Sequence, residues 1–202
     1  MLGVFIDSKL NFSKNISKLC SKLSYCTHLL RKFTNILSRR QLISIYYAYA
    51  HSIISYGITI WGLSAKKYIN KLNKIHNILI RCIWGVNGNT NRIKTKDMYK
   101  NLNILTINNL LLYSLANNIH KLKNDIGSSL IRSSINRNNL STRTTRHNRL
   151  IRKPKVKISS LKKSFIWAGP TVYNKIPEKI KKSLSFKKEL KKYLIKPEPI
   201  LI

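Results

Sequence analysis

The carboxylates are the residues of this chain that could support polymerase or nuclease chemistry, and their positions argue against both. Such chemistry on phosphodiesters uses two metal ions held by carboxylates clustered in one site. The acids are instead scattered, with no two in a shared local motif: Asp7, Asp97, Asp125, Glu178, Glu189 and Glu198. His147 has no acidic neighbour, and no P-loop, GxGxxG or HExxH pattern occurs. The residues therefore predict no catalytic centre, no bound metal or cofactor and no small-molecule substrate.

Three cysteines, Cys20, Cys26 and Cys82, are too few for a disulfide framework, and none lies in a metal-type CxxC pair. Cys20 and Cys82 fall at apolar positions of predicted helices, which is typical of buried thiols. Free thiols favour a reducing compartment. The N-terminal stretch MLGVFIDSKL is too polar for a secretory signal. We therefore expect a nuclear or cytoplasmic protein that is not secreted.

The charge balance is the strongest compositional signal. The chain carries 39 Lys and Arg against 6 Asp and Glu, a formal net charge of +33. AT-rich codons could inflate Lys, but they should inflate Glu as well, and Glu is nearly absent. The asymmetry predicts a polyanionic partner, with nucleic acid as the first candidate and an anionic membrane surface as the second.

Two groups of cations are placed to bind phosphates within predicted helices. Lys14, Lys18 and Lys22 are four residues apart, so they stack on one face of a helix, with no Glu alternating between them. Such a row is often only a solvated face, but here it repels itself unless an anion lies along it. Arg39 and Arg40 fall in the first turn of a helix that Ser38 can cap, where the helix dipole disfavours cations and a nearby phosphate would relieve the repulsion.

A third basic group lies outside any helical pattern. The segment SSINRNNLSTRTTRHNRLIRK mixes Arg143, Arg146 and Arg149 with hydroxyl and amide side chains. Guanidinium and hydroxyl groups together are what a phosphate backbone requires. The segment predicts phosphate binding, and a disordered basic linker is the alternative. Because nothing here resembles a recognition helix or an aromatic RNA-binding platform, we expect contacts to phosphates that are independent of sequence.

Apolar residues at steps of three and four predict the helices that position these cations. Three long helices are expected to pack together, over Ser13–Leu37, Arg39–Trp61 and Lys66–Trp84, with Ser13 as the cap of the first and His76 as a buried core histidine. The second contains Leu42–Leu63, which holds no charged residue. Its predicted buried face is Leu42, Ile45, Tyr46, Tyr49, Ile53, Tyr56 and Ile60. A membrane span is the alternative for this stretch, but its tyrosines, histidine and hydroxyls argue against lipid.

The remaining segments predict a small mixed region after a fourth helix. Strands are expected at Leu2–Ile6, Val156–Ile158 and Ser164–Trp167, turns at Gly169-Pro170 and Ile176-Pro177, and helices over 106–122 and Phe186–Ile195. The fold class is thus mainly α, a bundle of long amphipathic helices with a small α+β C-terminal region. The predicted divisions are 1–12, a helical domain 13–124, a basic linker 125–153 and a C-terminal region 154–202.

Six segments, in this order, resemble reverse transcriptases of non-LTR retrotransposons of the jockey or RTE kind. They are LGVFIDSKLNFSKNI, IYYAYAHSIISYGITIWG, LNKIHNILIRCIWG, NILTINNLLLYSLANNIHKL, NNLSTRTTRHNRL and SFIWAGPTVYNKIPEKIKKSLSFKKELKKYL. Together they run from Leu2 to Leu194. The chain departs from the family pattern at Phe12 and Tyr173, where the family has tryptophan, and at Asn15, where it has histidine.

The resemblance implies a C-terminal piece of such an enzyme, including the end of the palm hairpin that positions the primer (Leu2, Gly3 and Val4), the helical thumb and the post-polymerase region. The parent enzyme is an RNA-directed DNA polymerase that uses Mg²⁺, and its metal-binding aspartates lie in the palm, upstream of this segment. The implied partners are RNA or an RNA–DNA duplex, bound through phosphates, and the missing palm domain. We expect no polymerase activity from this chain alone.

A dedicated basic scaffold protein that binds nucleic acid, with no polymerase origin, is the alternative function. The genomic sequence upstream of Met1 distinguishes the two. An upstream aspartate motif of the YADD type, in frame or frameshifted, supports the retrotransposon origin, whereas promoter and untranslated sequence supports the scaffold.

Overall fold

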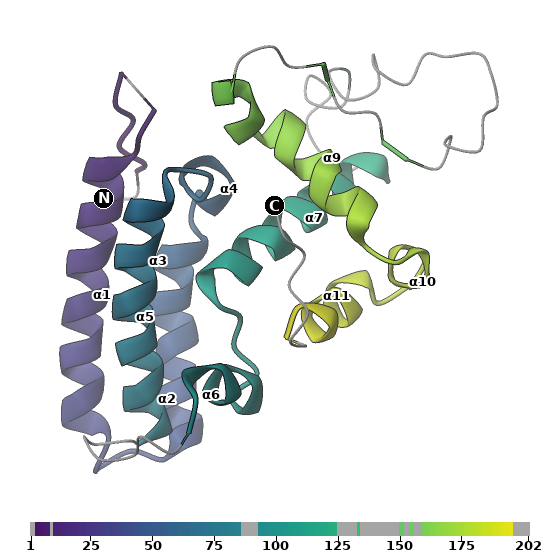
Figure 1. Ribbon diagram of the computed structural model, residues 1–202. Coiled ribbons are helices and arrows are strands. Elements are labelled where there is room, and N and C mark those ends of the chain that lie inside the picture. Colours follow the sequence, from purple (N-terminus) through teal and green to yellow (C-terminus); the bar gives the residue numbers. More distant parts are fainter. Residues whose placement is uncertain are drawn as a thin grey trace. The chain divides into compact units, whose positions relative to one another are not determined.

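The computed structural model describes residues 3–8, 10–85, 93–124, 133, 150–151, 154–155 and 159–195. These residues form helices joined by turns and loops, with no strand among them, so the predicted mainly α class is confirmed (Figure 1). The chain divides into two compact units, Met1–Leu110 and Leu111–Ile202. The divisions predicted at 124 and 153 adjoin residues outside the described ranges and stay predictions.

The first unit is a helical bundle in which α1 and α5 pack along each other and the central segment, α2 with η1, packs against both (Figure 1). A short helix, α6, packs on α5. The elements of this unit are α1 (Ser13–Phe33), α2 (Arg39–Ile45), the π-helical turn η1 (Tyr46–His51), α3 (Ser52–Ser55), α4 (Ile58–Trp61), α5 (Lys66–Trp84) and α6 (Thr95–Asn101).

Apolar residues at helical spacing form the core of this bundle. In α1, Ile16, Leu23 and Leu30 are almost fully buried, and in α5 Leu72 and Leu79 are completely so. Each such side chain contributes about 1.5–3 kcal/mol by leaving water. This burial keeps one face of α1 inside and turns its opposite face, which carries the lysines, to solvent.

The central segment differs from the single helix predicted over Arg39–Trp61. The π-helical turn η1 inserts an extra residue, which displaces the later side chains by about 100° around the axis. The buried residues are therefore Tyr46 and Ala50 within η1 and Ile54 in α3, and Ile58 is buried beyond the corner at Gly57. The predicted face was wrong there: Tyr49 and Tyr56 are partly exposed, at 40% and 46%.

The central helical run ends at Tyr56, whose ψ of 115° is extended, and Gly57, whose φ of 62° is left-handed. A Cβ at Gly57 would lie 2.8 Å from Cγ2 of Val4. Glycine is therefore required at this corner by both its backbone angle and the close approach of the N-terminal segment.

The cap predicted for α2 is present, and the cap predicted for α1 is not. Ser38 and Gln41 form a capping box at the start of α2, with the Ser38 hydroxyl accepting from the backbone N–H of Gln41. Ser13 is not the cap of α1. The preceding residue, Phe12, occupies the cap position with a left-handed φ of 55° and no side-chain hydrogen bond, so Ser13 is already the first helical residue.

The predicted N-terminal strand is wrong for its described residues, 3–6. A lone strand needs a partner for its backbone groups, and the described part of the chain offers none. The backbone N–H of Phe5 instead donates to Oδ1 of Asn15 in α1 at 3.2 Å. The segment therefore stays irregular and is fastened to the start of α1 through a side chain.

The described residues of the second unit also form helices and no strand, so the predicted α+β C-terminal region is not supported. Its elements are η3 (Ser159–Lys163), α9 (Phe165–Lys175), α10 (Glu178–Lys181) and α11 (Phe186–Ile195), while α7 (Ile107–Lys123) spans the division between the units. The helix predicted over Phe186–Ile195 is present as α11. The strand predicted at Val156–Ile158 lies outside the described residues.

Helix α9 replaces the strand predicted at Ser164–Trp167 and the turn predicted at Gly169-Pro170. Gly169 serves packing in this helix: a Cβ there would lie 2.9 Å from two side-chain atoms of Ile119 in α7. Close contact between α7 and α9 therefore outweighs the local preference of Gly-Pro for a turn. The second predicted turn, at Ile176-Pro177, does separate α9 from α10.

An aromatic cluster lines the interior of the second unit. The rings of His120 and Phe186 stack with centroids 3.8 Å apart, and Nδ1 of His120 lies 3.1 Å from the hydroxyl of Tyr173. Burial, and then the charge of Glu178, raise the pKa of Tyr173 to about 12. Tyr173, at the position where the resembling family has tryptophan, is thus a neutral core residue.

Candidate nucleic-acid interface

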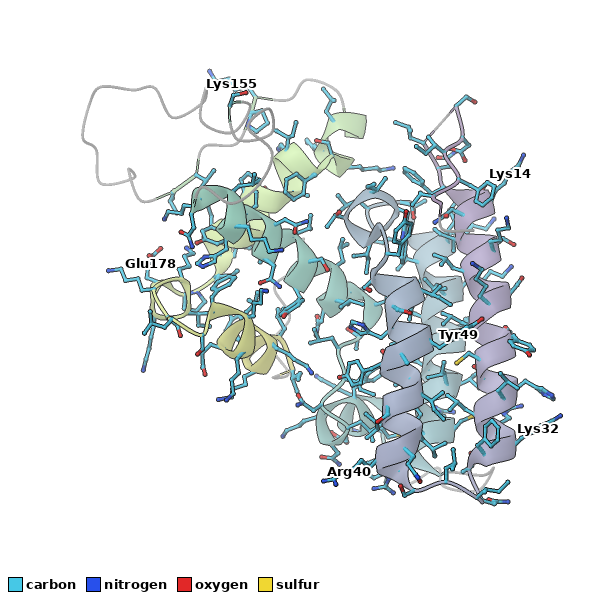
Figure 2. All side chains as sticks on the ribbon, turned by 180° about the vertical axis from the view of Figure 1, so that it is seen from behind. Lys14, Lys32, Arg40, Tyr49, Lys155 and Glu178 are labelled. Carbon is cyan, nitrogen blue, oxygen red and sulfur yellow. The ribbon has the colours of Figure 1, made fainter. Side chains whose placement is uncertain are left out.

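The predicted lysine row lies on the exposed face of α1. Lys14, Lys18 and Lys22 are all solvent-exposed. They follow one another at four-residue spacing over the first three turns, so their positions rise by about 6 Å each along the axis. Figure 2 shows Lys14 directed away from the bundle at the N-terminal end of α1.

The first unit holds few negative charges that could balance this row. Helix α1 contains no acidic residue, and the first unit holds only two, Asp7 and Asp97. The Asp7 carboxylate accepts the backbone N–H of Asn11 at 2.6 Å and so closes the turn before α1. Asp97 lies in the first turn of α6, where a carboxylate stabilises the helix dipole. Neither acid is part of α1, so no carboxylate of this helix offsets the repulsion among the lysines of the row.

The residues proposed to form a primer-positioning hairpin are only partly described. Leu2 lies outside the described residues, and Gly3 and Val4 lie in the irregular segment before α1. Val4 packs over Gly57, and Phe5 lies beneath the Lys18 ammonium group, which is 3.9 Å from the ring centroid. The structure therefore brings this segment to the N-terminal end of the lysine row.

Arg39 and Arg40 lie at the start of α2, beyond the C-terminal end of α1, so they do not join Lys14 in one cluster (Figure 2). Arg39 has a structural role that the sequence did not reveal. Its guanidinium stacks on the Trp84 ring at 4.4 Å and donates to the Trp84 carbonyl at 3.2 Å. Arg40 is exposed at the same end.

Sequence reasoning missed one member of the row. Lys32 is exposed near the end of α1 and lies eighteen residues after Lys14, which is five full turns of a 3.6-residue helix. That spacing could have identified it. Lys14 and Lys32 both lie on the outer side of α1, whereas Arg40 lies on α2 across the bundle, so Lys32 extends the row along α1 and Arg40 is not part of it (Figure 2). Arg143, Arg146 and Arg149 lie outside the described residues.

His76 joins the helices that hold this face in place. As predicted, it is a buried core residue. Tyr99 donates its hydroxyl hydrogen to Oδ1 of Asn77 at 2.9 Å, so the Tyr99 oxygen accepts from Nδ1–H of His76 at 2.8 Å. His76 Nε2 is therefore unprotonated and accepts from the Tyr46 hydroxyl at 3.0 Å.

The buried network is electrically neutral. Burial, and then the charge of His51, lower the pKa of His76 to about 3. Burial raises the pKa of both Tyr46 and Tyr99 above their ordinary range. These groups hold their protons in one fixed order, and their role is to specify how the central segment and α6 pack on α5.

Among the described residues, no group of three or more His, Cys, Asp or Glu is placed to hold a metal ion. Within the same ranges, no helix combines the length and the apolar character needed to cross a membrane. Comparison with protein-family models, with curated proteins and with solved structures finds no match for this chain.

Proposed function

We propose that this chain is the thumb and post-polymerase part of a non-LTR retrotransposon reverse transcriptase, and that it binds RNA or an RNA–DNA duplex through phosphates. The observation that carries the binding proposal is the exposed row of Lys14, Lys18 and Lys22 on a helix without an acid. The resemblance of six ordered segments supports the retrotransposon origin and the thumb-like identity of the helical bundle. Its place of action is then the nucleus or the cytoplasm.

Binding of this kind is governed by counterion release. Each phosphate neutralised by Lys or Arg releases counterions, so the logarithm of the binding constant falls by about 0.7–0.9 per contact for each unit of log salt. Because the contacts are to phosphates, affinity should be micromolar and nearly the same for all sequences. Neither a small molecule nor a membrane is required as a partner.

The test is a titration of fluorescently labelled RNA and RNA–DNA duplex with the full chain at several salt concentrations. Replacing Arg143, Arg146 and Arg149 by alanine should lower the salt slope by about two to three units and weaken all sequences alike. An unchanged slope would show that the arginine segment makes no phosphate contacts and is only a solvated linker. A loss confined to one sequence would mean that the segment reads bases.

The proposal also predicts that the chain alone extends no primer, because polymerisation requires clustered carboxylates. Asp7, the acid nearest the lysine row in sequence, already accepts a hydrogen bond from the backbone N–H of Asn11. Primer extension by the purified chain on an RNA template with Mg²⁺, lost in Asp7→Ala, would contradict this. In the proposed enzyme, Mg²⁺ and the carboxylates that hold it belong to the palm.

A further inference from the structure

The exposed face of α1 carries an aromatic ring within its row of cations. Lys18, Tyr25 and Lys32 recur every seven residues, which is close to two helical turns, so they share one line along the axis. Successive members are about 10 Å apart at 1.5 Å per residue. Tyr25 is 59% exposed, and both lysines are exposed as well. The core does not require this ring, because the buried positions of α1 lie on its other face.

A second ring lies at the N-terminal end of the same line. Phe5 is 45% exposed, and its ring is covered on one side by the Lys18 ammonium group at 3.9 Å. The hydrogen bond from its backbone N–H to Oδ1 of Asn15 holds the backbone of Phe5 beside α1. A third exposed ring, Tyr49, comes from η1, which packs against α1 (Figure 2).

Alternating cations and exposed rings suit a single strand better than a duplex. Unpaired bases can stack on aromatic side chains while lysines neutralise the neighbouring phosphates, and the stacking is tolerant of sequence. In a duplex the base faces are stacked on one another, so exposed rings gain nothing and only the cations contribute. The acid-free surface of α1 provides the charge complementarity to a polyanion.

We propose that the α1 stripe, defined as Lys14, Lys18, Tyr25 and Lys32 with Phe5 at its end, binds single-stranded nucleic acid with a base stacked on Tyr25. This inference rests on the nucleic-acid binding proposed above and specifies which form is bound. The lysines hold the phosphates, and Tyr25 supplies the preference for unpaired bases.

The experiment compares two labelled twelve-nucleotide oligonucleotides that carry the same phosphates, one with bases and one abasic. Fluorescence anisotropy with the full chain should show about five- to tenfold tighter binding of the oligonucleotide with bases, the lower part of the range for one stacked base. Tyr25→Leu should remove most of this preference without weakening the abasic complex. Tyr25→Phe keeps the ring and should keep the preference.

Tyr56→Leu is the matched control, since Tyr56 is also a partly exposed tyrosine of the first unit but lies in the turn between α3 and α4. It should bind both oligonucleotides like the wild type. Circular dichroism of each variant checks that the fold is intact, and Tyr25→Gln provides a second ring-free variant if Tyr25→Leu is misfolded.

The outcomes separate this inference from the function on which it rests. If both oligonucleotides bind equally and Tyr25→Leu changes neither, phosphate binding stands and stacking on Tyr25 is wrong. Tighter binding of a duplex that carries the same number of phosphates as the single strand would also overturn the inference. If no nucleic acid binds, both proposals fail. Phosphatidylserine vesicles provide the last comparison, at the same concentration of negative charge as the oligonucleotide. If they displace the oligonucleotide, the stripe binds membranes instead.

Discussion

The hydroxyl of Tyr46 donates to Nε2 of His76 across 3.0 Å in the core of the first unit. This contact joins the π-helical turn η1 to α5, and the other ring nitrogen of His76 bonds Tyr99 of α6. The neutral imidazole of His76 thus connects three elements, η1, α5 and α6. Because buried polar groups cost free energy when they lose their partners, this network specifies one arrangement of the helices.

Replacing His76 by leucine should lower the free energy of unfolding by about 2–4 kcal/mol, because the Tyr46 hydroxyl loses its acceptor and the Tyr99 oxygen its donor. Urea denaturation followed by circular dichroism measures the change. His28→Leu, an exposed position on α1, should stay within about 0.5 kcal/mol of the wild type. Equal effects of the two variants would show that the network does not stabilise the core.

Because folding lowers the pKa of His76, the free energy of unfolding should decrease at acidic pH. The unfolded chain binds a proton near the ordinary value of 6.5, whereas the folded chain does so only near 3. The contribution is therefore fully present above pH 6.5 and is lost as the pH falls toward 3, at up to ~1.4 kcal/mol per pH unit. Urea midpoints measured over this range should fall more steeply for the wild type than for His76→Leu; parallel curves would contradict the assignment.

Gly57 and Gly85 allow the cost of a left-handed backbone to be separated from a steric clash. Both have positive φ, at 62° and 82°, but only Gly57 has a close neighbour, Val4. Gly85→Ala should cost about 1–2 kcal/mol from the backbone alone, and Gly57→Ala should cost more. The added Val4→Ala substitution should recover part of the excess. If Gly57→Ala costs no more than Gly85→Ala in urea denaturation, the N-terminal segment is not packed there.

The periodicity of the sequence was sufficient for α1 and α5, whose apolar residues repeat at ordinary helical spacing. It failed for the central segment, because a π-helical turn changes which residues face inward. The only sign of the turn is that the buried residues Leu42, Tyr46, Ala50 and Ile54 follow one another at steps of four. It failed again at α9, where the contact between Gly169 and Ile119 is tertiary and has no local signature.

For the candidate site, the four-residue spacing of Lys14, Lys18 and Lys22 was enough to predict a shared face. The sequence could not show that Arg39 is engaged by Trp84, since the two are distant in the chain. Tyr25 was overlooked as well, although its seven-residue spacing from Lys18 places it on the same face of the helix, where the structure shows it exposed.

The neighbours Arg39 and Arg40 should differ in stability effect. Arg39→Ala removes the stack on Trp84 and the hydrogen bond to its carbonyl, and should cost about 0.5–1 kcal/mol. Arg40→Ala removes the same charge and should cost less than about 0.5 kcal/mol. Thermal denaturation of the two variants makes the comparison, and a larger loss for Arg40→Ala would show that the wrong arginine has been given the structural role.

The lysine row is tested most directly by the salt dependence of RNA binding in two charge-matched triple variants. One replaces Lys14, Lys18 and Lys22 by alanine, and the control replaces three exposed lysines of the second unit, Lys179, Lys187 and Lys188. Both remove three charges. The α1 variant should lower the log–log salt slope by about two to three units, and the control should leave it within about half a unit. Equal changes in the two variants would show that binding follows net charge alone and that the exposed face of α1 is not the binding surface.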